Sequence, residues 1–272
     1  EGASFAQSEA EARRFEAALR GDADVGSITT FVGTGAPRFY LPLDQIFPQS
    51  NVVQLIVLPV DVEVRERLRQ RIIALLASDF PQLRGRVKLL PNGPPVAYPV
   101  QFRVIGPEAA GVRRIADQVK AIMSANPNTV GVNDNWNENV KVLRLDIDQE
   151  KARALGVTTN AIARVTQTVL TGAPVGQYRD GDKLIDIVMR SARDEREALA
   201  DLHNVQVPTA SGRAVPLTQV ARIGIRSEPG IVWRENRDFG VTVQADVVDG
   251  IQGPTVTAQI NPQLDKLRAE LP

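Results

Sequence analysis

The sequence predicts an α+β fold with two ferredoxin-like split βαβ regions and an α+β segment inserted into the second of them. Up to residue 90, helical and strand periods follow the order helix, strand, strand, helix, strand. A second βαβ pattern begins after a Pro- and Gly-rich stretch, and the strand and helix that complete it appear only after residue 225. The residues in between therefore form an insertion.

The first region starts with a helix over about residues 4–20. Ser4 and Gln7 form a capping box, apolar residues at helical spacing follow, and Gly21 ends the helix. Period and composition then predict strands at 25–32 and 51–58, a helix at 61–79 and a strand at 86–90. This order lacks the first strand of a ferredoxin-like unit, which we expect upstream of residue 1.

The stretch PNGPP at 91–95 is typical of a linker. Beyond it the pattern predicts strands at 99–105, 129–132 and 239–248, and helices at 107–125 and 255–270, the last delayed or kinked by Pro262. We therefore assign the first region to 1–95, the second to 96–140 and 226–272, and the insertion to 141–225.

The insertion is predicted to contain a strand at 142–147, two helices, a protruding hairpin, a short helix from Asp194, and strands through Val205 and Val215. Asp180-Gly181 indicates a type I′ turn at the tip of the hairpin, because both residue types tolerate positive φ.

Composition excludes several classes of function. Lys plus Arg and Asp plus Glu number 32 each, so no basic surface for nucleic acid or anionic membrane is expected. The absence of cysteine removes thiol catalysis, Cys-ligated zinc and disulfides. No apolar run reaches the roughly 18 residues of a membrane helix. Because the chain starts at Glu1 without a methionine, we expect it to be a piece of a longer protein.

Two groups of side chains are candidates for a chemical site. Asp146, Asp148 and Glu150 resemble a cation site, but an EF-hand loop needs glycine where Arg153 stands. The stronger interpretation is a helix start, with Asp148 as its N-cap. His203 is the single histidine and no G-x-S-x-G elbow exists, so a hydrolytic triad is disfavoured. We predict no catalytic residue, no metal site and no cofactor.

The long loop after residue 32 is the best candidate for ligand binding. It places Arg38, Phe39, Tyr40 and Phe47 among prolines and glycines, and Gly33, Gly35 and Pro37 are interpreted as its hinge. These aromatic residues are predicted to form a mobile lid over a hydrophobic ligand. The alternative is that they fold back onto their own sheet.

Several strings, in this order, resemble one family closely: EGAS, LRLDIDQEKARALGVTTNAIARVTQTVLTG, YRDGDKLIDIVMR and VPTASGRAVPLTQVARI. The chain resembles the second periplasmic loop of resistance-nodulation-division (RND) efflux pumps over essentially its whole length. The resemblance implies two porter subdomains and an inserted docking subdomain. It also implies a periplasmic portion of a bacterial inner-membrane protein, whose membrane helices and proton relay lie outside this chain.

The resemblance further implies proton-driven export of small amphiphilic compounds or drugs by a homotrimer. A periplasmic adaptor protein and an outer-membrane channel are the implied partners. The loop over 33–44 matches the element that separates two binding pockets in such pumps.

Other residues take their predicted roles from the same resemblance. Asn133, Asn135 and Trp136 match positions that line the ligand cleft, although a surface tryptophan in an Asn-rich hairpin is an equal interpretation. The predicted docking hairpin contains Tyr178, Asp180 and Gly181. Met123 and Met189 are far apart in sequence, which disfavours copper or silver export. The competing hypothesis is a free-standing periplasmic ligand-binding or assembly module.

Overall fold

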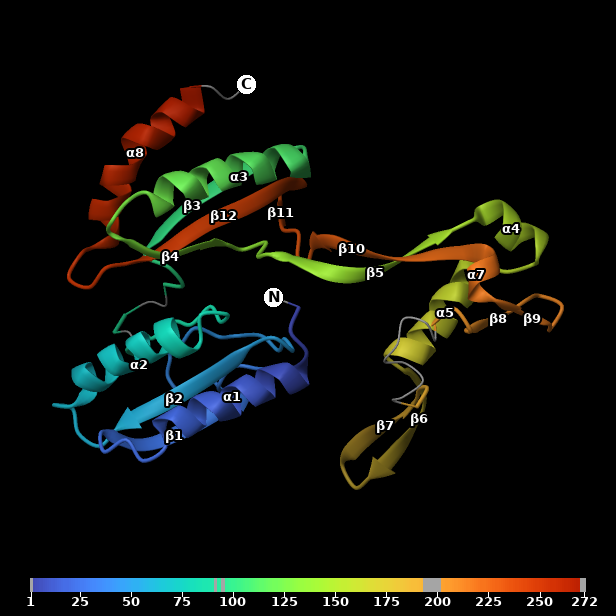
Figure 1. Ribbon diagram of the computed structural model, residues 1–272, viewed down its shortest axis with the longest axis horizontal. Coiled ribbons are helices and arrows are strands. Elements are labelled where there is room, and N and C mark those ends of the chain that lie inside the picture. The colour runs from blue at the N-terminus through green and yellow to red at the C-terminus, as the bar shows by residue number, and fades with distance from the viewer. Residues whose placement is uncertain (1, 91, 94–95, 193–201, 270–272) are drawn as a thin grey trace. The chain divides into compact units, whose positions relative to one another are not determined.

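The computed structural model describes residues 2–90, 92–93, 96–192 and 202–269. The chain divides into two compact units, Glu1–Val140 with Pro229–Pro272, and Lys141–Glu228. The α+β class is confirmed, because helices cover small antiparallel sheets in the larger unit (Figure 1). Whether these units act as porter and docking subdomains stays a prediction.

The first region contains two helices and a two-stranded antiparallel sheet, as the sequence pattern predicts. Its elements are α1 (Phe5–Leu19), β1 (Val25–Val32), β2 (Val53–Pro59) and α2 (Arg65–Asp79). The Ser4 hydroxyl accepts a hydrogen bond from the Gln7 N–H at 3.2 Å, so the predicted cap of α1 is confirmed. Phe15 and Phe80 meet edge to face at 5.3 Å in the core between helices and sheet.

The strand predicted at 86–90 is wrong. Among the residues that the structure describes, they pair with no strand, and their cationic side chains are engaged elsewhere. Arg86 binds the Asp246 carboxylate with two hydrogen bonds of 2.6 Å, and Lys88 lies 3.2 Å from Asp44. Apolar periodicity alone did not reveal this, because a strand also needs a neighbouring edge with which to pair.

The second region is a split βαβ fold. Its elements are β3 (Val100–Gly106), α3 (Ala109–Ser124), β4 (Thr129–Asp134), β11 (Arg234–Glu235), β12 (Asp238–Val247) and α8 (Gly253–Ala269). Strand β12 pairs antiparallel with both β3 and β4, so it separates two mutually parallel strands. Its buried residues Val241, Val243 and Ala245 pack with α3 and α8 in the largest core. The C-terminal strand and helix therefore complete a fold begun at residue 100.

The smaller unit is entered and left through the two-stranded sheet of β5 (Asn139–Ile147) and β10 (Ala221–Pro229). It also contains α4 (Gln149–Ala154), α5 (Thr159–Leu170), β6 (Ala173–Asp180), β7 (Lys183–Met189), β8 (Gln206–Pro208), β9 (Ala214–Pro216) and α7 (Leu217–Val220). Ile162, Val207 and Leu217 lie in its core. The helix expected from Asp194 falls outside the described residues.

The carboxylates at the end of β5 form a helix start, as the stronger interpretation proposed. The Lys151 N–H donates to Asp148 at 3.1 Å, and this backbone hydrogen bond, with the Lys151 side chain, lowers the pKa of Asp148. Gly156 follows α4 with φ +69°. Asp148 is therefore an N-cap and Gly156 the stop of α4.

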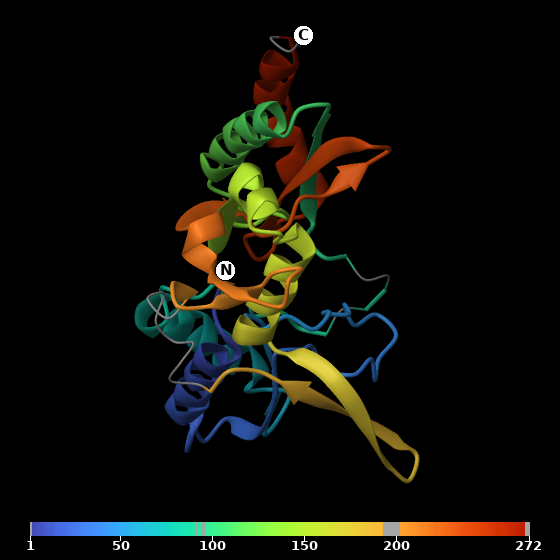
Figure 2. The ribbon, with the colours of Figure 1, turned by 90° about the vertical axis from the view of Figure 1, so that its right-hand side faces the viewer.

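The β6–β7 hairpin forms where the sequence predicts it and projects from the rest of its unit in both ribbon views (Figures 1 and 2). Its register pairs Asp180 with Lys183, so the turn residues are Gly181 and Asp182. Gly181 has φ +60° and Asp182 does not have positive φ. This is the pattern of a type II′ turn, and the predicted type I′ turn is wrong.

Candidate ligand-binding site

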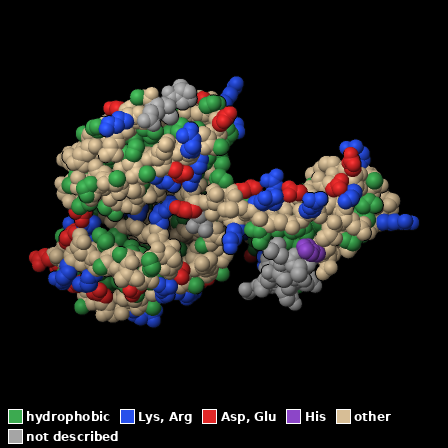
Figure 3. Space-filling model, turned by 45° about the horizontal axis from the view of Figure 1, so that its top comes forward, with side chains coloured by type: hydrophobic (Ala, Val, Ile, Leu, Met, Phe, Trp, Pro, Cys, Tyr) green, Lys and Arg blue, Asp and Glu red, His purple; other side chains and the backbone are tan. Residues whose placement is uncertain are grey.

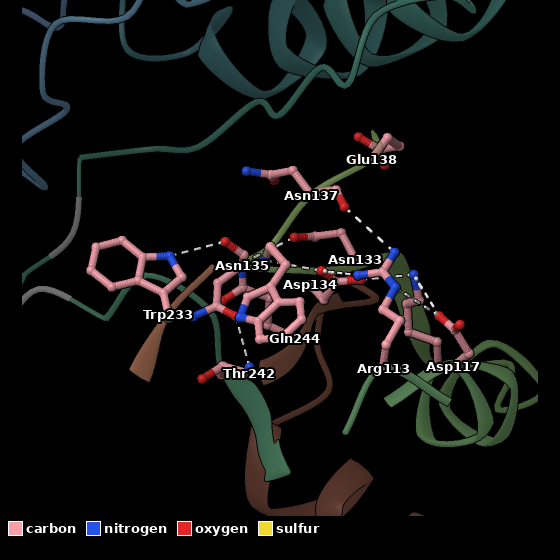
Figure 4. A network of polar contacts seen from close by, with 12 residues as sticks. Arg113, Asp117, Asn133, Asp134, Asn135, Asn137, Glu138, Trp233, Thr242 and Gln244 are labelled. Atoms are coloured by element: carbon pink, nitrogen blue, oxygen red, sulfur yellow. Dashed lines mark hydrogen bonds and ion pairs between the residues drawn. The ribbon is translucent and has the colours of Figure 1, made fainter. Parts of the chain in front are cut away.

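The Asn-rich turn that follows β4 is organised around one buried carboxylate. Asp134 is contacted by Arg113 at 3.0 Å and Lys120 at 2.8 Å, and it accepts a third hydrogen bond from the Trp136 N–H at 3.0 Å. Figure 4 shows Arg113 approaching Asp134 from one side while Trp233 lies on the other, beside Asn135. Because the buried charge has two cations and a backbone donor, the turn is held in one conformation.

Trp136 is a core residue. Its side chain is 1% exposed, its indole N–H donates to the Gly240 carbonyl at 2.9 Å, and its ring meets Phe239 edge to face. Neither the prediction that Trp136 lines a ligand cleft nor the surface interpretation fits this burial. The sequence suggested exposure because the neighbouring residues are polar, but their polar atoms are used within the turn itself.

The two predicted asparagines differ in what they offer. Asn133 is buried, donates to the Gly131 carbonyl at 2.7 Å and accepts from Gln244 at 3.0 Å. It therefore serves the turn rather than a ligand. The Asn135 side-chain oxygen accepts from the Thr242 N–H at 2.8 Å, and its backbone carbonyl accepts from the Trp233 indole at 3.1 Å. Asn135 also lines a pocket.

This pocket has a volume of about 190 Å³. Its lining residues are Arg103, Asn135, Trp233, Arg234, Glu235, Gly240 and Thr242. Trp233 is 53% exposed, in contrast to the other tryptophan of the chain. Of these residues, only Asn135 was predicted from the sequence as a site residue. A useful signal was present, since the tryptophan closes a short apolar run, Ile231 to Trp233, directly before the charged residues Arg234 and Glu235.

A tight turn holds one wall of the pocket in place. Strand β11 pairs with β12, with Glu235 opposite Asp238, so Asn236 and Arg237 form a two-residue turn. Both have positive φ, 51° and 78°. This is the type I′ pattern, which normally places glycine second, so an arginine there is strained. Such strain is typical of sites where the chain must present particular side chains.

Backbone hydrogen bonds hold the two ends of the predicted binding loop together. The Gly33 N–H donates to Val52 at 2.8 Å and its carbonyl accepts from Gln49 at 3.0 Å, while the Gly35 N–H donates to Ile46. A Cβ on Gly33, whose φ is +73°, would lie 2.8 Å from the Phe5 ring, and one on Gly35 would lie 2.7 Å from Ile46. Opening at these glycines would have to break these hydrogen bonds.

The apex of this loop presents apolar side chains to solvent. Phe39, Leu41 and Phe47 are 58%, 77% and 69% exposed. Pro37 is exposed and accepts a hydrogen bond from the Phe39 N–H at 2.8 Å, and Arg38 donates to the Leu41 carbonyl. Hence the alternative, that Phe39 and Phe47 fold back onto the sheet, does not describe this conformation.

Tyr40 has a different position within the loop. It is partly buried, and its hydroxyl donates to the Asn92 side chain at 3.2 Å. The ring therefore links the loop to the segment around residue 92. Of the four residues predicted to contact ligand in this loop, Phe39 and Phe47 offer the most free apolar surface.

The β6–β7 hairpin also exposes apolar residues, on both of its faces. The exposed set consists of Val175, Tyr178, Leu184, Ile185, Ile187, Val188 and Met189. A two-stranded hairpin has only marginal stability by itself in water. Exposed apolar patches are typical of surfaces that contact other proteins or membranes.

Metal-binding groups are sparse in the part of the chain that the structure describes. No cluster of three or more His, Cys, Asp or Glu residues is present there. Met123 is fully buried in the core around α3.

Figure 3 shows Lys and Arg interspersed with Asp and Glu on the face drawn. Within the same described residues, no helix has the length and apolarity needed to cross a bilayer.

Three comparisons place the chain among known proteins. The sequence model of the AcrB/AcrD/AcrF family matches residues 1–270. The chain is 26% identical over 156 residues to the putative cation efflux system protein SilA of Salmonella typhimurium. It is 26% identical over 193 residues to the nickel and cobalt resistance protein CnrA of Cupriavidus metallidurans, and 24% over 169 residues to the swarming motility protein SwrC of Bacillus subtilis.

These alignments cover 57%, 68% and 61% of this chain but only 15%, 18% and 16% of the three relatives. A solved structure of a heavy metal efflux pump superposes with a TM-score of 0.73 at 20% identity, over 100% of this chain and 28% of that chain. The chain therefore shares the fold of one part of such a protein. With its family model matched over nearly its whole length, the chain belongs to the AcrB/AcrD/AcrF family.

Proposed function

We propose that the chain is the periplasmic porter and docking portion of a proton-driven RND exporter of amphiphilic compounds. The family match and the loop apex support this proposal. Phe39, Leu41 and Phe47 expose apolar side chains on a loop whose two ends are joined by backbone hydrogen bonds. Apolar side chains held out to solvent favour contact with an apolar ligand, because burying each one gains about 1.5–3 kcal/mol.

Assembly is part of the same proposal. In it, the β6–β7 hairpin, with Tyr178, Asp180 and Gly181 at and near its tip, docks to neighbouring protomers of a homotrimer. The exposed apolar residues on both hairpin faces support a protein partner. A periplasmic adaptor and an outer-membrane channel would complete the export path, and membrane helices outside this chain would supply the proton relay.

The whole transporter tests the loop. We expect Phe39→Ala combined with Phe47→Ala to lower export of amphiphilic dyes by tenfold or more, since tenfold needs about 1.4 kcal/mol and full burial of each side chain contributes roughly 1.5–3 kcal/mol. The measurement is dye efflux from cells that lack other RND exporters. Leu58→Ala is the matched control, because Leu58 is similarly exposed but lies on β2 outside the loop. Unchanged export of every dye by the double variant would reject the loop assignment.

Metal-cation export is the second candidate, because two relatives are a putative cation efflux system protein and a nickel and cobalt resistance protein. Growth of the same cells with nickel, cobalt and silver salts separates the two substrates. Resistance to these salts without export of any dye would replace amphiphiles by metal ions in the proposal. Met123 is buried in a packed core and is not free to bind a metal, whereas Met189 is 56% exposed.

The free-standing binding module makes a different prediction. Such a module would bind an amphiphilic dye tightly as an isolated monomer, whereas a porter portion should bind weakly outside its trimer. Calorimetric titration of the 272-residue chain, with its mass measured by light scattering, distinguishes these outcomes.

A further inference from the structure

We propose that Asn92 is a site of spontaneous deamidation, and that its conversion into isoaspartate loosens the predicted binding loop (33–50). In this modification the backbone nitrogen of the following residue attacks the side-chain amide, ammonia leaves, and water opens the ring that has formed. The modification does not depend on which substrate the protein exports.

The sequence singles out one asparagine for this chemistry. Asn92-Gly93 is the only Asn-Gly pair among the 272 residues, and each other asparagine is followed by a residue with a Cβ. Asparagine is a thermolabile residue type. Because glycine has no Cβ, its backbone nitrogen approaches the preceding side chain without steric hindrance. Asn92 is therefore the asparagine most suited to ring closure.

The structure leaves space around this pair. Asn92 and Gly93 are both exposed and lie outside helices and strands. Gly93 has φ +112°, and among the described residues only its chain neighbours come within 4 Å of the position that a Cβ would occupy. The approach of the Gly93 nitrogen to the Asn92 side chain is thus not blocked by packing.

Asn160 shows that exposure alone does not create such a site. It is exposed as well, but it lies in the first turn of α5. The backbone nitrogen that would have to attack belongs to Ala161, and its N–H donates to the Thr158 hydroxyl at 3.1 Å. This nitrogen is held in a helix cap and carries the hindrance of a Cβ, so Asn160 should remain intact.

The chemical step is balanced with water as the only co-reactant. The Gly93 nitrogen bonds to Cγ of Asn92, and the side-chain nitrogen leaves as ammonia together with the proton that Gly93 gives up. Water then breaks one of the two C–N bonds of the five-membered ring. Opening at Cγ gives aspartate, whereas opening at the main-chain carbonyl gives isoaspartate, in which the main chain runs through Cβ and Cγ and is one carbon longer.

The modified side chain is part of a contact with the predicted binding loop. Asn92 Oδ1 accepts a hydrogen bond from the Tyr40 hydroxyl at 3.2 Å. In isoaspartate this oxygen belongs to the main chain, so we expect the hydrogen bond to break. The loop apex with Phe39, which is 58% exposed, would then lose one link to the segment around residue 92.

Mass spectrometry tests the modification itself. The folded 272-residue chain is incubated at neutral and at mildly alkaline pH and then digested with trypsin, which releases 89–103 as a peptide with Asn92 as its single asparagine. We expect isoaspartate and aspartate at residue 92 to accumulate, faster at the higher pH because the Gly93 nitrogen must lose its proton. Asn160 should stay unmodified. Asn92→Gln should lose the change, since glutamine would need a six-membered ring.

Brief trypsin treatment of the folded chain tests the effect on the loop. Arg38 is exposed in the loop, and proteolysis tracks the population of the open form. We expect incubation to speed cleavage after Arg38 about threefold to tenfold, the range that loss of one hydrogen bond predicts. Tyr40→Phe should show the same rise without incubation. Asn92→Gln, incubated in parallel, should keep its initial rate.

Two results would overturn the proposal. An Asn92 that stays unmodified in the folded chain, or that converts no faster than Asn160, would refute the site. Equal cleavage after Arg38 in fresh and fully converted chain would refute the link between the modification and the loop.

Discussion

At the scale of single residues, the most consequential side chain is Asp134. Its carboxylate is almost completely buried and holds Arg113, Lys120 and the Trp136 backbone together. A buried charge is tolerated only with such partners, and removing it leaves two cations without their counter-charge. The turn beside the pocket therefore depends on one residue that does not itself line the pocket.

We expect Asp134→Asn to lower the free energy of unfolding by about 3 kcal/mol, because breaking a buried ion pair costs roughly 3–5 kcal/mol. Denaturant unfolding of the chain measures this change. Asp117→Asn is the matched control, since Asp117 contacts the same two cations but its side chain is 54% exposed, and it should cost about 0–1 kcal/mol. Equal costs for the two variants would contradict this account.

Asp24 makes stability depend on pH. Hydrogen bonds from Arg67 and Arg71 lower the pKa of this carboxyl from 3.8 to about 2. A group whose pKa is depressed by folding stabilises the native state above its ordinary pKa and loses this effect as pH falls through the folded value. Its contribution should therefore be complete near neutral pH and disappear from about pH 4 down to about pH 2.

Asp24→Asn provides the measurement. We expect the variant to be less stable than the unaltered chain at neutral pH, with the difference in free energy of unfolding shrinking through that acidic range. Urea titrations at several pH values report it. A difference that stays constant down to the lowest pH would show that the two arginines do not perturb Asp24.

At the scale of elements, the turn between β11 and β12 has a backbone conformation that one of its two residues disfavours. Positive φ at Asn236 is ordinary for asparagine, but φ of 78° at Arg237 is unfavourable for a side chain with a Cβ. The surrounding sheet enforces it, because β11 and β12 pair with Glu235 opposite Asp238 and leave only two residues for the turn.

Replacing Arg237 by glycine should therefore stabilise the chain by about 1 kcal/mol, because left-handed backbone costs a residue with a Cβ roughly 1–2 kcal/mol. Thermal and denaturant unfolding both report the change. Arg226→Gly is the matched control, since Arg226 lies within β10 without positive φ and should be destabilised by roughly 0.5–1 kcal/mol. A loss of stability in Arg237→Gly would show that its side chain, not its backbone, matters at this turn.

At the scale of the whole molecule, the chain leaves the larger unit through β5 and returns through β10, and these strands pair. Val140 and Gly230, at the two crossing points, lie against each other. A short link between these two positions could therefore replace the residues between them. The β3–β12–β4 sheet depends on residues before and after the insertion but on none inside it.

We expect replacement of residues 141–228 by a short Gly-Ser linker to leave the larger unit folded. Joining neighbouring ends adds little loop-closure entropy. Cooperative thermal unfolding by circular dichroism, and the emission of buried Trp136, test this outcome. A shortened chain without a cooperative transition would show that the smaller unit is needed for the larger one.

Local chemistry alone determined most elements of this protein. The Ser4 and Asp148 caps, the helical stripe of α1 and the alternation along β12 were all predictable, because each depends on residues a few positions apart. The interruption of the second region was also predictable, since its last strand and helix follow residue 225. The family itself was predicted from strings such as DIDQEKARALGV, and the family match confirms it.

Tertiary structure alone decided where side chains point and which strands find partners. Residues 86–90 have the apolar pattern of a strand, yet they pair with no strand among the described residues, and Arg86 binds Asp246. Trp136 sits among polar residues and is buried, whereas Trp233 follows two apolar residues and is exposed at the pocket. Burial and strand pairing depend on residues distant in sequence, and a local pattern holds no information about those partners.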